Sequence, residues 1–313
     1  MPSREAVINP QPSPSEITVF APAKINLILR ILDRRPDGFH NLWSVMQTVA
    51  LDDEVQIRLR TDRQDIRLRC DAAQLAADQS NLVYGAATEM LARAQQSIGL
   101  DIELRKCIPM GAGLGGGSSD AAATIIGLNH LLQLKWSPAQ MADAGQSLGS
   151  DVPFFLFAPS AFVASRGEAV RPVVVEGARW VVLVNPGFGV NTKWAYQELA
   201  ATRAAVTPLS LVQRELDRQS RVNWAQLIAA AENDFEAPVF AAHGELREIK
   251  RSLQAHGAEI ALLSGSGATV FGVFADEACA RLAQAQFVSE SAMKVFVIPT
   301  CAGPLSWRYE RPQ

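Results

Sequence analysis

Five glycines stand within seven residues of this 313-residue chain, in the run Gly111-Ala-Gly-Leu-Gly-Gly-Gly117, directly before an apolar segment with helical spacing. An ordered glycine costs up to about 1 kcal/mol more than an alanine, so a cluster of them needs a reason. Without Cβ atoms, backbone N–H groups can converge on an anion, and the start of a following helix adds unpaired donors and the positive end of its dipole. The run therefore predicts a phosphate-binding loop, with a flexible turn as the alternative.

Two common phosphate loops fit these residues poorly. The spacing Gly111-x-Gly113-x-x-Gly116 matches the dinucleotide fingerprint, but residues 129–136 lack the acidic residue expected about 20 positions later. The spacing Gly111-x-x-x-x-Gly116 also opens a P-loop, but Gly117 stands where that loop needs its lysine. A dehydrogenase built on the first pattern stays a distant alternative.

Length and charge narrow the class of protein. At roughly 150 residues per domain the length predicts about two domains. The net charge of −3 argues against a nucleic-acid or anionic-membrane binder, and no obligate protein partner is evident. No stretch approaches 18 apolar residues and no secretory signal is visible, so we expect a cytoplasmic protein. Residues 1–15, with four prolines, are expected to form a flexible tail.

The spacing of the cysteines and histidines indicates neither a disulfide framework nor a metal site. The four cysteines are far apart in sequence, which predicts reduced, mostly buried thiols rather than a disulfide framework. The four histidines do not cluster, so a zinc site is not expected. No acidic residue stands in a diagnostic metal spacing, so the ligands of any metal are left unassigned.

The periodicity of apolar residues predicts an α+β chain. Alternating positions predict strands at 17–19, 25–31, 55–59, 66–68 and 101–104, the first two joined at a bend at 21–23. Helical spacing of apolar residues predicts helices at 81–98 and 118–134. A cap at Ser137, followed by Pro138 and the capping-box residue Gln140, predicts a short helix that ends at Gly149. Further helices are expected at 232–242, 246–256 and 278–286, and further strands at 180–184, 260–263, 269–274 and 294–298.

The segment Pro109–Ser119 resembles the central ATP-binding motif of the GHMP kinases (galactokinase, homoserine kinase, mevalonate kinase, phosphomevalonate kinase). Two further segments resemble motifs of that superfamily and fall in its order, at 21–27 and at 263–268. The segments Arg35-Pro-Asp-Gly-Phe-His40 and Gly149-Ser-Asp-Val-Pro153 are similar to one branch in particular. That branch phosphorylates the 2-hydroxyl of a cytidine diphosphate ester of methylerythritol, in non-mevalonate isoprenoid synthesis. The resemblance runs from about residue 18 to residue 298.

The resemblance implies a fold and two substrates. The fold would be α+β with two domains, an N-terminal ATP-binding unit similar to ribosomal protein S5 domain 2 (16–172) and a ferredoxin-like C-terminal unit (173–313) that contributes to the substrate cleft. ATP would be the phosphoryl donor, accompanied by Mg²⁺. The acceptor would carry a cytidine diphosphate group. Alternatives are another small-molecule kinase of the superfamily, of the homoserine or mevalonate type, and a non-catalytic nucleotide-binding protein.

The resemblance also implies a catalytic pair, Asp151 and Lys24. The Asp151 carboxylate would accept the proton of the acceptor hydroxyl, and Lys24 would keep that carboxylate ionised and offset charge near the γ-phosphate. Local sequence alone favours a helix N-cap for Asp151, because Asp-Val-Pro after a glycine is ordinary capping sequence. A lysine at the start of a strand is, by the same standard, usually solvated.

The other implied site residues fall into two groups. Phe39 and Tyr196 would stack on the cytosine, His40 would hydrogen-bond its edge, Asn26 would lie near the diphosphate and erythritol, and Gly267 would approach from the second domain. Each aromatic side chain has a core position as its alternative. For ATP, the implied residues are Pro109, Met110, Gly111, Ala112, Gly113, Leu114, Gly115, Gly116, Gly117, Ser118, Ser119, Asn81 and Lys106. Of these, Asn81 is alternatively a residue at a helix start and Lys106 a surface charge.

Overall fold

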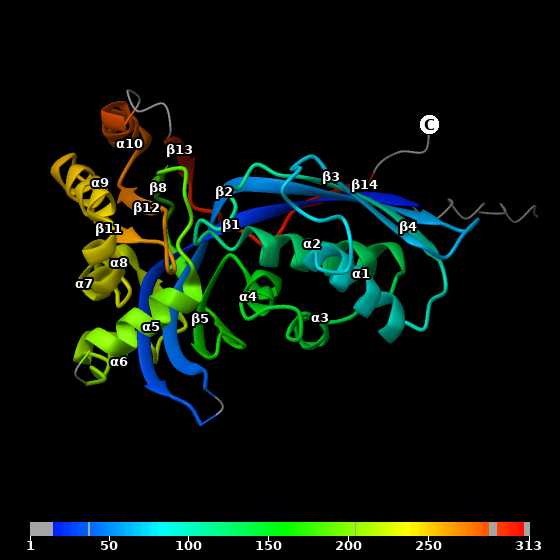
Figure 1. The fold of residues 1–313 in the computed structure, drawn as a ribbon, viewed down its shortest axis with the longest axis horizontal. Coiled ribbons are helices and arrows are strands. Elements are labelled where there is room, and N and C mark those ends of the chain that lie inside the picture. Colours follow the sequence, from blue (N-terminus) through cyan, green and yellow to red (C-terminus); the bar gives the residue numbers. More distant parts are fainter. Residues whose placement is uncertain (1–14, 37, 204, 288–292, 310–313) are drawn as a thin grey trace, which may run out of the picture.

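A long mixed sheet and the helices on one of its faces build the larger half of the molecule (Figure 1). The computed structural model describes residues 15–36, 38–203, 205–287 and 293–309, so the predicted tail lies outside it apart from Ser15. The strands run in the order β10-β1-β2-β4-β3, with β14 paired to β1 and β5 paired to both β2 and β6. Their bounds are β1 Glu16–Arg34, β2 His40–Arg60, β3 Ile66–Cys70, β4 Gly99–Arg105, β5 Ser160–Ser165, β6 Ala169–Pro172, β10 Glu232–Asn233 and β14 Trp307–Tyr309.

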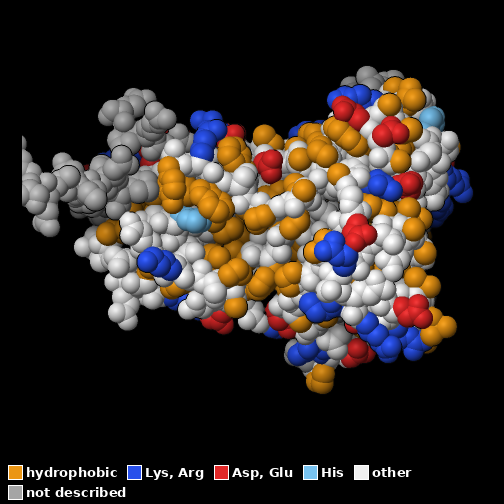
Figure 2. Space-filling model, turned by 180° about the vertical axis from the view of Figure 1, so that it is seen from behind, with side chains coloured by type: hydrophobic (Ala, Val, Ile, Leu, Met, Phe, Trp, Pro, Cys, Tyr) orange, Lys and Arg blue, Asp and Glu red, His pale blue; other side chains and the backbone are white. Residues whose placement is uncertain are grey.

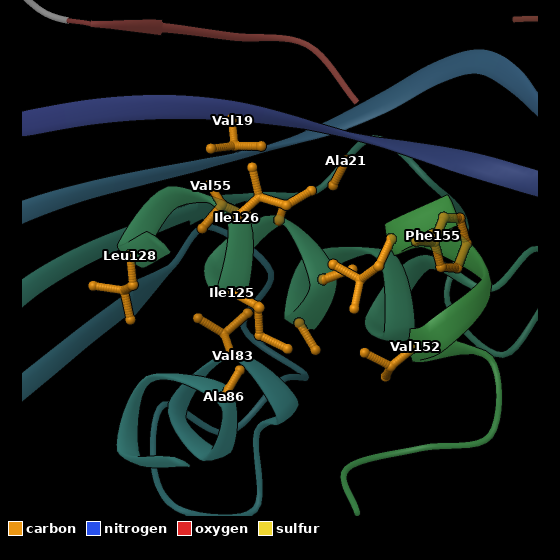
Figure 3. Packing of buried hydrophobic residues seen from close by; sticks show 14 of the residues in the cluster. Val19, Ala21, Val55, Val83, Ala86, Ile125, Ile126, Leu128, Val152 and Phe155 are labelled. Atoms are coloured by element: carbon orange, nitrogen blue, oxygen red, sulfur yellow. The ribbon is translucent and has the colours of Figure 1, made fainter. Parts of the chain in front are cut away.

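Four helices pack under this sheet: α1 (Leu82–Arg93), α2 (Gly116–Leu131), α3 (Pro138–Gly145) and α4 (Val152–Phe157). Helix α2 is apolar on nearly all sides because it lies between the sheet and the other helices. Figure 3 shows Ile125 and Ile126 of this helix between Val83 of α1 and Val19 of β1. Burial of this apolar surface on both sides fixes α2, and with it the glycine loop that precedes it.

The second half contains a four-stranded antiparallel sheet in the order β11-β12-β8-β13. Its strands are β8 Trp180–Asn185, β11 Ile260–Leu263, β12 Val270–Phe274 and β13 Lys294–Pro299, and its helices are α9 Gly244–Ala255 and α10 Glu277–Gln284. Helix α9 buries Leu246, Ile249 and Leu253, at spacings of three and four residues, against the sheet. The chain order β8-α9-β11-β12-α10-β13 is the split βαββαβ arrangement, which confirms the ferredoxin-like expectation.

The remaining elements lie outside the two large sheets, mostly between β8 and α9 in the chain order. They are α5 Thr192–Thr202, α6 Leu211–Leu216, α7 Trp224–Ala230, α8 Glu236–Ala242, the short pair β7 Val174–Glu176 and β9 Arg221–Asn223, and a 3₁₀ turn at Ala285–Phe287. Helix α5 begins at an Asn191 cap, whose side chain accepts the Trp194 N–H, and it faces the junction of the two halves.

Several predicted boundaries were wrong. Residues 16–34 form one strand rather than two, because the proline bend is taken up as a register shift between Pro22 and Ala23 within continuous pairing to β2. The helix predicted at 81–98 ends at Arg93, and that predicted at 232–242 begins at Glu236 because residues 232–233 pair with β1. The domain boundary at 172 stays a prediction, and both β10 and β14 cross it to join the first sheet.

The exposure of the cysteine thiols differs from the prediction. Cys107 and Cys279 are exposed, and Cys70 and Cys301 are half-buried, so the prediction of mostly buried thiols was wrong, although all four are free.

Lys and Arg side chains alternate with Asp and Glu over the face seen in Figure 2, without a continuous patch of one sign among the side chains shown there. None of the helices in the described ranges has the length and apolarity that crossing a bilayer requires.

Candidate active site

Two segments far apart in sequence, at residue 24 and at 264–269, meet at the glycine loop through hydrogen bonds to its backbone carbonyls. The Lys24 N–H donates to Leu114 O at 2.9 Å, the Thr269 N–H donates to Ala112 O at 3.2 Å, and Ser264 Oγ donates to Gly113 O at 2.9 Å. The three motifs identified in the sequence therefore form one structure. The loop belongs to the first half of the chain but is held partly by the second.

Gly113 could not be any other residue without a backbone shift. Its φ is +77°, and a Cβ at this position would lie 2.0 Å from Ser264 O. Gly115, with φ of +71°, is similarly crowded, since its Cβ would lie 2.9 Å from Lys24 Cγ. Close backbone approach thus explains part of the glycine cluster. The rest of the loop turns its backbone toward an open cavity.

That cavity, of about 390 Å³, lies over the loop at the start of α2. It is lined by twelve of the thirteen residues predicted to bind ATP, together with Leu75, Ser80, Leu82, Ile108 and Asp120. Asn81 caps α1 through its Oδ1, which accepts the Val83 N–H at 3.0 Å, and it also borders the cavity. Ser119 does not line it, because its side chain is buried beneath the loop, where its Oγ has no partner among the described residues.

Lys24 and Asp151 face each other across a second, smaller cavity of about 160 Å³. Lys24 Nζ lies 3.5 Å from Asp151 Oδ2 and donates to Asn26 Oδ1 at 2.7 Å. The side chain of Lys24 is 5% exposed and that of Asp151 is 30% exposed. Asp151 does stand at the N-cap position of α4, but its carboxylate makes no capping bond. The carboxylate is therefore available to a ligand in the cavity.

A third cavity, of about 580 Å³, opens beside the second one and carries aromatic rings. The rings of His40 and Tyr196 stack with centroids 5.0 Å apart and planes 18° apart. The guanidinium of Arg166 lies over the exposed ring of Phe39, 5.4 Å from its centroid. Together with Arg34, these groups give the cavity flat faces and positive charge, which suit a heterocyclic base and an anionic group.

Local electrostatics fix the protonation of two of these side chains. Burial, together with the nearby Asp151 charge, raises the pKa of the Tyr196 hydroxyl to about 12, so it stays protonated at neutral pH. Burial and then the charges of Arg34 and Arg203 lower the pKa of His40. His40 therefore offers a neutral imidazole, with one donor and one acceptor nitrogen, to a ligand.

The three cavities form a continuous series. The small cavity shares Gly113 and Gly115 with the glycine-loop cavity, and it shares Asp151, Thr192 and Tyr196 with the aromatic cavity. An acceptor bound among the aromatic rings and a phosphate bound at the loop would therefore meet beside Asp151. This juxtaposition is the arrangement that phosphoryl transfer needs.

Two predicted residues, Ser119 and Gly267, lie outside the walls of the three cavities, and several lining residues were not predicted. Gly267 is absent from the described walls of all three cavities, whereas its neighbours Gly265 and Ser266 line the small one. Thr192 was missed, although its hydroxyl lies 2.9 Å from Ser266 Oγ at the start of α5. Arg166 was also missed, because nothing in its local sequence distinguishes it from other arginines. Asn26 lines the small cavity beside Lys24, and it donates to Ser44 Oγ at 2.9 Å; its expected contact with the diphosphate and erythritol stays a prediction.

Comparison with protein families defines the class. The family model for the N-terminal domain of GHMP kinases matches residues 81–158. The family model for the C-terminal domain of GHMP kinases matches residues 212–291. A crystal structure of homoserine kinase from Cytophaga hutchinsonii shares the fold with a TM-score of 0.74, at 20% identity over 96% of this chain and all of that one. The fold is that of the GHMP kinases, which are ATP-dependent small-molecule phosphotransferases.

Curated relatives define the branch. A 4-diphosphocytidyl-2-C-methyl-D-erythritol kinase of Geobacter sp. (strain M21) is 40% identical over 87% of this chain and 94% of its own length, and one from Syntrophotalea carbinolica is 40% identical over 89% and 97%. A crystal structure of 4-(cytidine 5'-diphospho)-2C-methyl-D-erythritol kinase superposes with a TM-score of 0.73, at 29% identity over 91% of this chain and all of that one. The chain belongs to the 4-diphosphocytidyl-2-C-methyl-D-erythritol kinase family.

Proposed function

We propose that this chain transfers the γ-phosphoryl group of ATP to the 2-hydroxyl of 4-diphosphocytidyl-2-C-methyl-D-erythritol, giving the 2-phosphate and ADP. The observation that carries the proposal is the series of three cavities, with Asp151 at the point where the glycine-loop and aromatic cavities communicate. The identity with curated kinases of this name supports the choice of acceptor. The reaction supplies isoprenoid precursor synthesis, and we place it in the cytoplasm.

The proposed chemistry uses Asp151 and Lys24. The Asp151 carboxylate takes the proton of the 2-hydroxyl as the oxygen attacks the γ-phosphorus, the bond from that phosphorus to the β–γ bridging oxygen breaks, and ADP leaves. Lys24, 3.5 Å from Asp151, stabilises the carboxylate in its ionised form and offsets negative charge at the transferring group. Because Asn26 accepts a hydrogen bond from Lys24, the ammonium is held in one orientation.

Phosphate binding is assigned to the backbone of the glycine loop and the first turn of α2, where N–H groups lack helical partners. We propose that Mg²⁺ enters with ATP as part of the substrate. No group of three or more His, Cys, Asp or Glu side chains that could hold an ion occurs within the described ranges. An ion carried by phosphate oxygens and water needs no such group, since Mg²⁺ keeps several waters in phosphotransfer sites.

The function is tested by incubating the purified protein with ATP, Mg²⁺ and 4-diphosphocytidyl-2-C-methyl-D-erythritol, with mevalonate and homoserine in parallel, and following ADP release. We expect ADP with the cytidylyl substrate alone, and a product with a new phosphate on the 2-hydroxyl. ADP release with mevalonate or homoserine instead would contradict the choice of acceptor. Clear ATP binding without turnover of any of the three would contradict the reaction but leave nucleotide binding in place.

The aromatic cavity gives a separate prediction. Replacing Tyr196 with alanine removes the ring stacked on His40, and since a base-stacking side chain contributes about 1–3 kcal/mol, KM for the cytidylyl substrate should rise by about 5- to 150-fold. The matched variant Tyr196→Phe keeps the ring and should stay within about threefold of wild type. Steady-state kinetics with each substrate varied in turn checks this. A comparable rise in KM for ATP would mean that Tyr196 supports the whole fold rather than the cytosine.

A further inference from the structure

A buried cluster of three charged side chains lies beneath the glycine loop and has no part in the proposed chemistry. Lys106 Nζ lies 2.6 Å from Asp120 Oδ2 and also donates to Asp53 Oδ2. The exposed fractions of the three side chains are 7% for Lys106, 3% for Asp120 and 0% for Asp53. Removing three charges from water is costly even when they are paired, so the cluster is expected to serve a purpose other than stability alone.

The cluster joins the two ends of the loop. Asp53, on β2, accepts the Cys107 N–H at 2.5 Å and the Ile108 N–H at 2.9 Å through its Oδ1, which fixes the chain just before the loop. Asp120 stands in α2, just after the loop. Lys106 bonds to both carboxylates. The residues just before the loop are therefore tied directly to Asp53 of the sheet, and the helix just after the loop is tied to the same side chain through Lys106.

The Lys106 ammonium is already engaged by two buried carboxylates. Lys106 lines the glycine-loop cavity, but its Nζ is bonded to the carboxylates of Asp53 and Asp120. Asp120 Oδ1 has no hydrogen-bond partner within the described part of the chain, so this carboxylate has Lys106 as its main partner. Burial raises the pKa of the Asp120 carboxyl, whereas the neighbouring Lys106 ammonium lowers it and favours the charged form. A side chain held in this way supports the loop from below rather than reaching over it.

We infer that Asp53 and Asp120 are positioning residues for ATP, which act through Lys106 to clamp the two ends of the glycine loop at a fixed separation. On this assignment the Lys106 ammonium does not pair with the phosphates. Its effect on ATP is indirect, through the spacing of the backbone N–H groups of the loop. The inference rests on the proposed binding of ATP by this loop, and it does not depend on the identity of the acceptor.

The variant Asp120→Asn separates the clamp from direct phosphate pairing, because the two assignments predict opposite signs. If Lys106 clamps the loop, loss of the charged hydrogen bond should raise the Kd for ATP by about fivefold or more, while kcat at saturating ATP stays within about threefold. If Lys106 paired with the phosphates, removal of a competing carboxylate would lower the Kd. Calorimetry with ATP and Mg²⁺, without acceptor, measures the Kd. A lowered or unchanged Kd would overturn the inference.

A second measurement needs neither substrate nor activity. Hydrogen exchange of the ligand-free protein should show the amides of residues 107–116 exchanging about fivefold faster in Asp120→Asn, and those of β8 unchanged. The control is Glu103→Gln, which removes the same charge from an exposed position on β4 and should alter neither observable. If Asp120→Asn fails to fold, Asp53→Asn keeps an oxygen for Cys107 and Ile108 but not the charge, and it should shift both observables in the same direction. Loop exchange at the wild-type rate in the folded variant would refute the clamp.

Discussion

Replacement of Asp151 by asparagine should reduce kcat by about 10²- to 10⁴-fold, equivalent to roughly 3–5 kcal/mol of activation free energy. The amide cannot accept the proton of the acceptor hydroxyl, and it loses its charge interaction with Lys24 at 3.5 Å. Folding should be unaffected, because the carboxylate makes no capping bond to α4. KM for both substrates should change much less than kcat. Single-turnover measurement of ADP formation, with circular dichroism as a check of folding, tests this.

A matched control for this variant is Glu248→Gln on α9, where an exposed carboxylate with a 2.9 Å ion pair to Arg251 is not part of the walls of the three cavities. It should retain wild-type turnover. If Asp151→Asn retained turnover within about fivefold of wild type, general-base catalysis by Asp151 would be excluded. Proton removal would then have to be assigned to another group or to solvent.

Replacement of Gly113 by alanine should have the largest effect on the structure of the site. The new Cβ would lie 2.0 Å from Ser264 O, and the residue would keep a φ of +77° that alanine adopts only with strain. Overpacking and a left-handed conformation each cost about 1–3 kcal/mol, so the free energy of unfolding should fall by at least about 2 kcal/mol. ATP affinity should fall as well, because the loop is displaced from the segment 264–269 that holds it.

The variant Gly111→Ala separates these two causes. Gly111 also has a positive φ, of +61°, but nothing lies within 4 Å of its added Cβ. It should lose about 1–2 kcal/mol, from the left-handed conformation alone. Urea unfolding of both variants, with ATP titration, gives the comparison. Equal losses at the two positions would show that close approach to Ser264 contributes nothing.

The parts of the site that lie close together in sequence were the most predictable. A run of glycines directly before a helix start is a distinctive local pattern, and the loop was predicted from that local sequence alone. Lys24 and Asp151 are 127 positions apart, and neither residue is distinctive locally; the local sequence favoured a cap for Asp151. Their pairing followed only from the resemblance, because the contact depends on how β1 and α4 pack against α2.

The missed residues share a physical cause. Asp53 belongs to a short run of acidic residues, which suggests an exposed position, yet its place on β2 buries its side chain completely. Thr192 lies at the start of α5, a helix that buries only Ala195 and Leu199 and so gives a weak periodic signal. Side chains whose role depends on a long-range contact leave no trace in local periodicity. Fold class and the glycine loop could be predicted, whereas the buried cluster and the junction of the two halves could not.

The pairing of β14 and β10 with β1 determines how this chain could be divided or recombined. Separating it after residue 172 would remove two of the three partner strands of β1, leaving only β2, and would expose unpaired N–H and C=O groups along the strand that carries Lys24. Such a fragment would be prone to edge-to-edge aggregation. A chimaera of two relatives joined at residue 172 would have to pair β10 and β14 of one parent with β1 of the other. Recombination should therefore succeed at surface loops within each half, and fail at the junction between them.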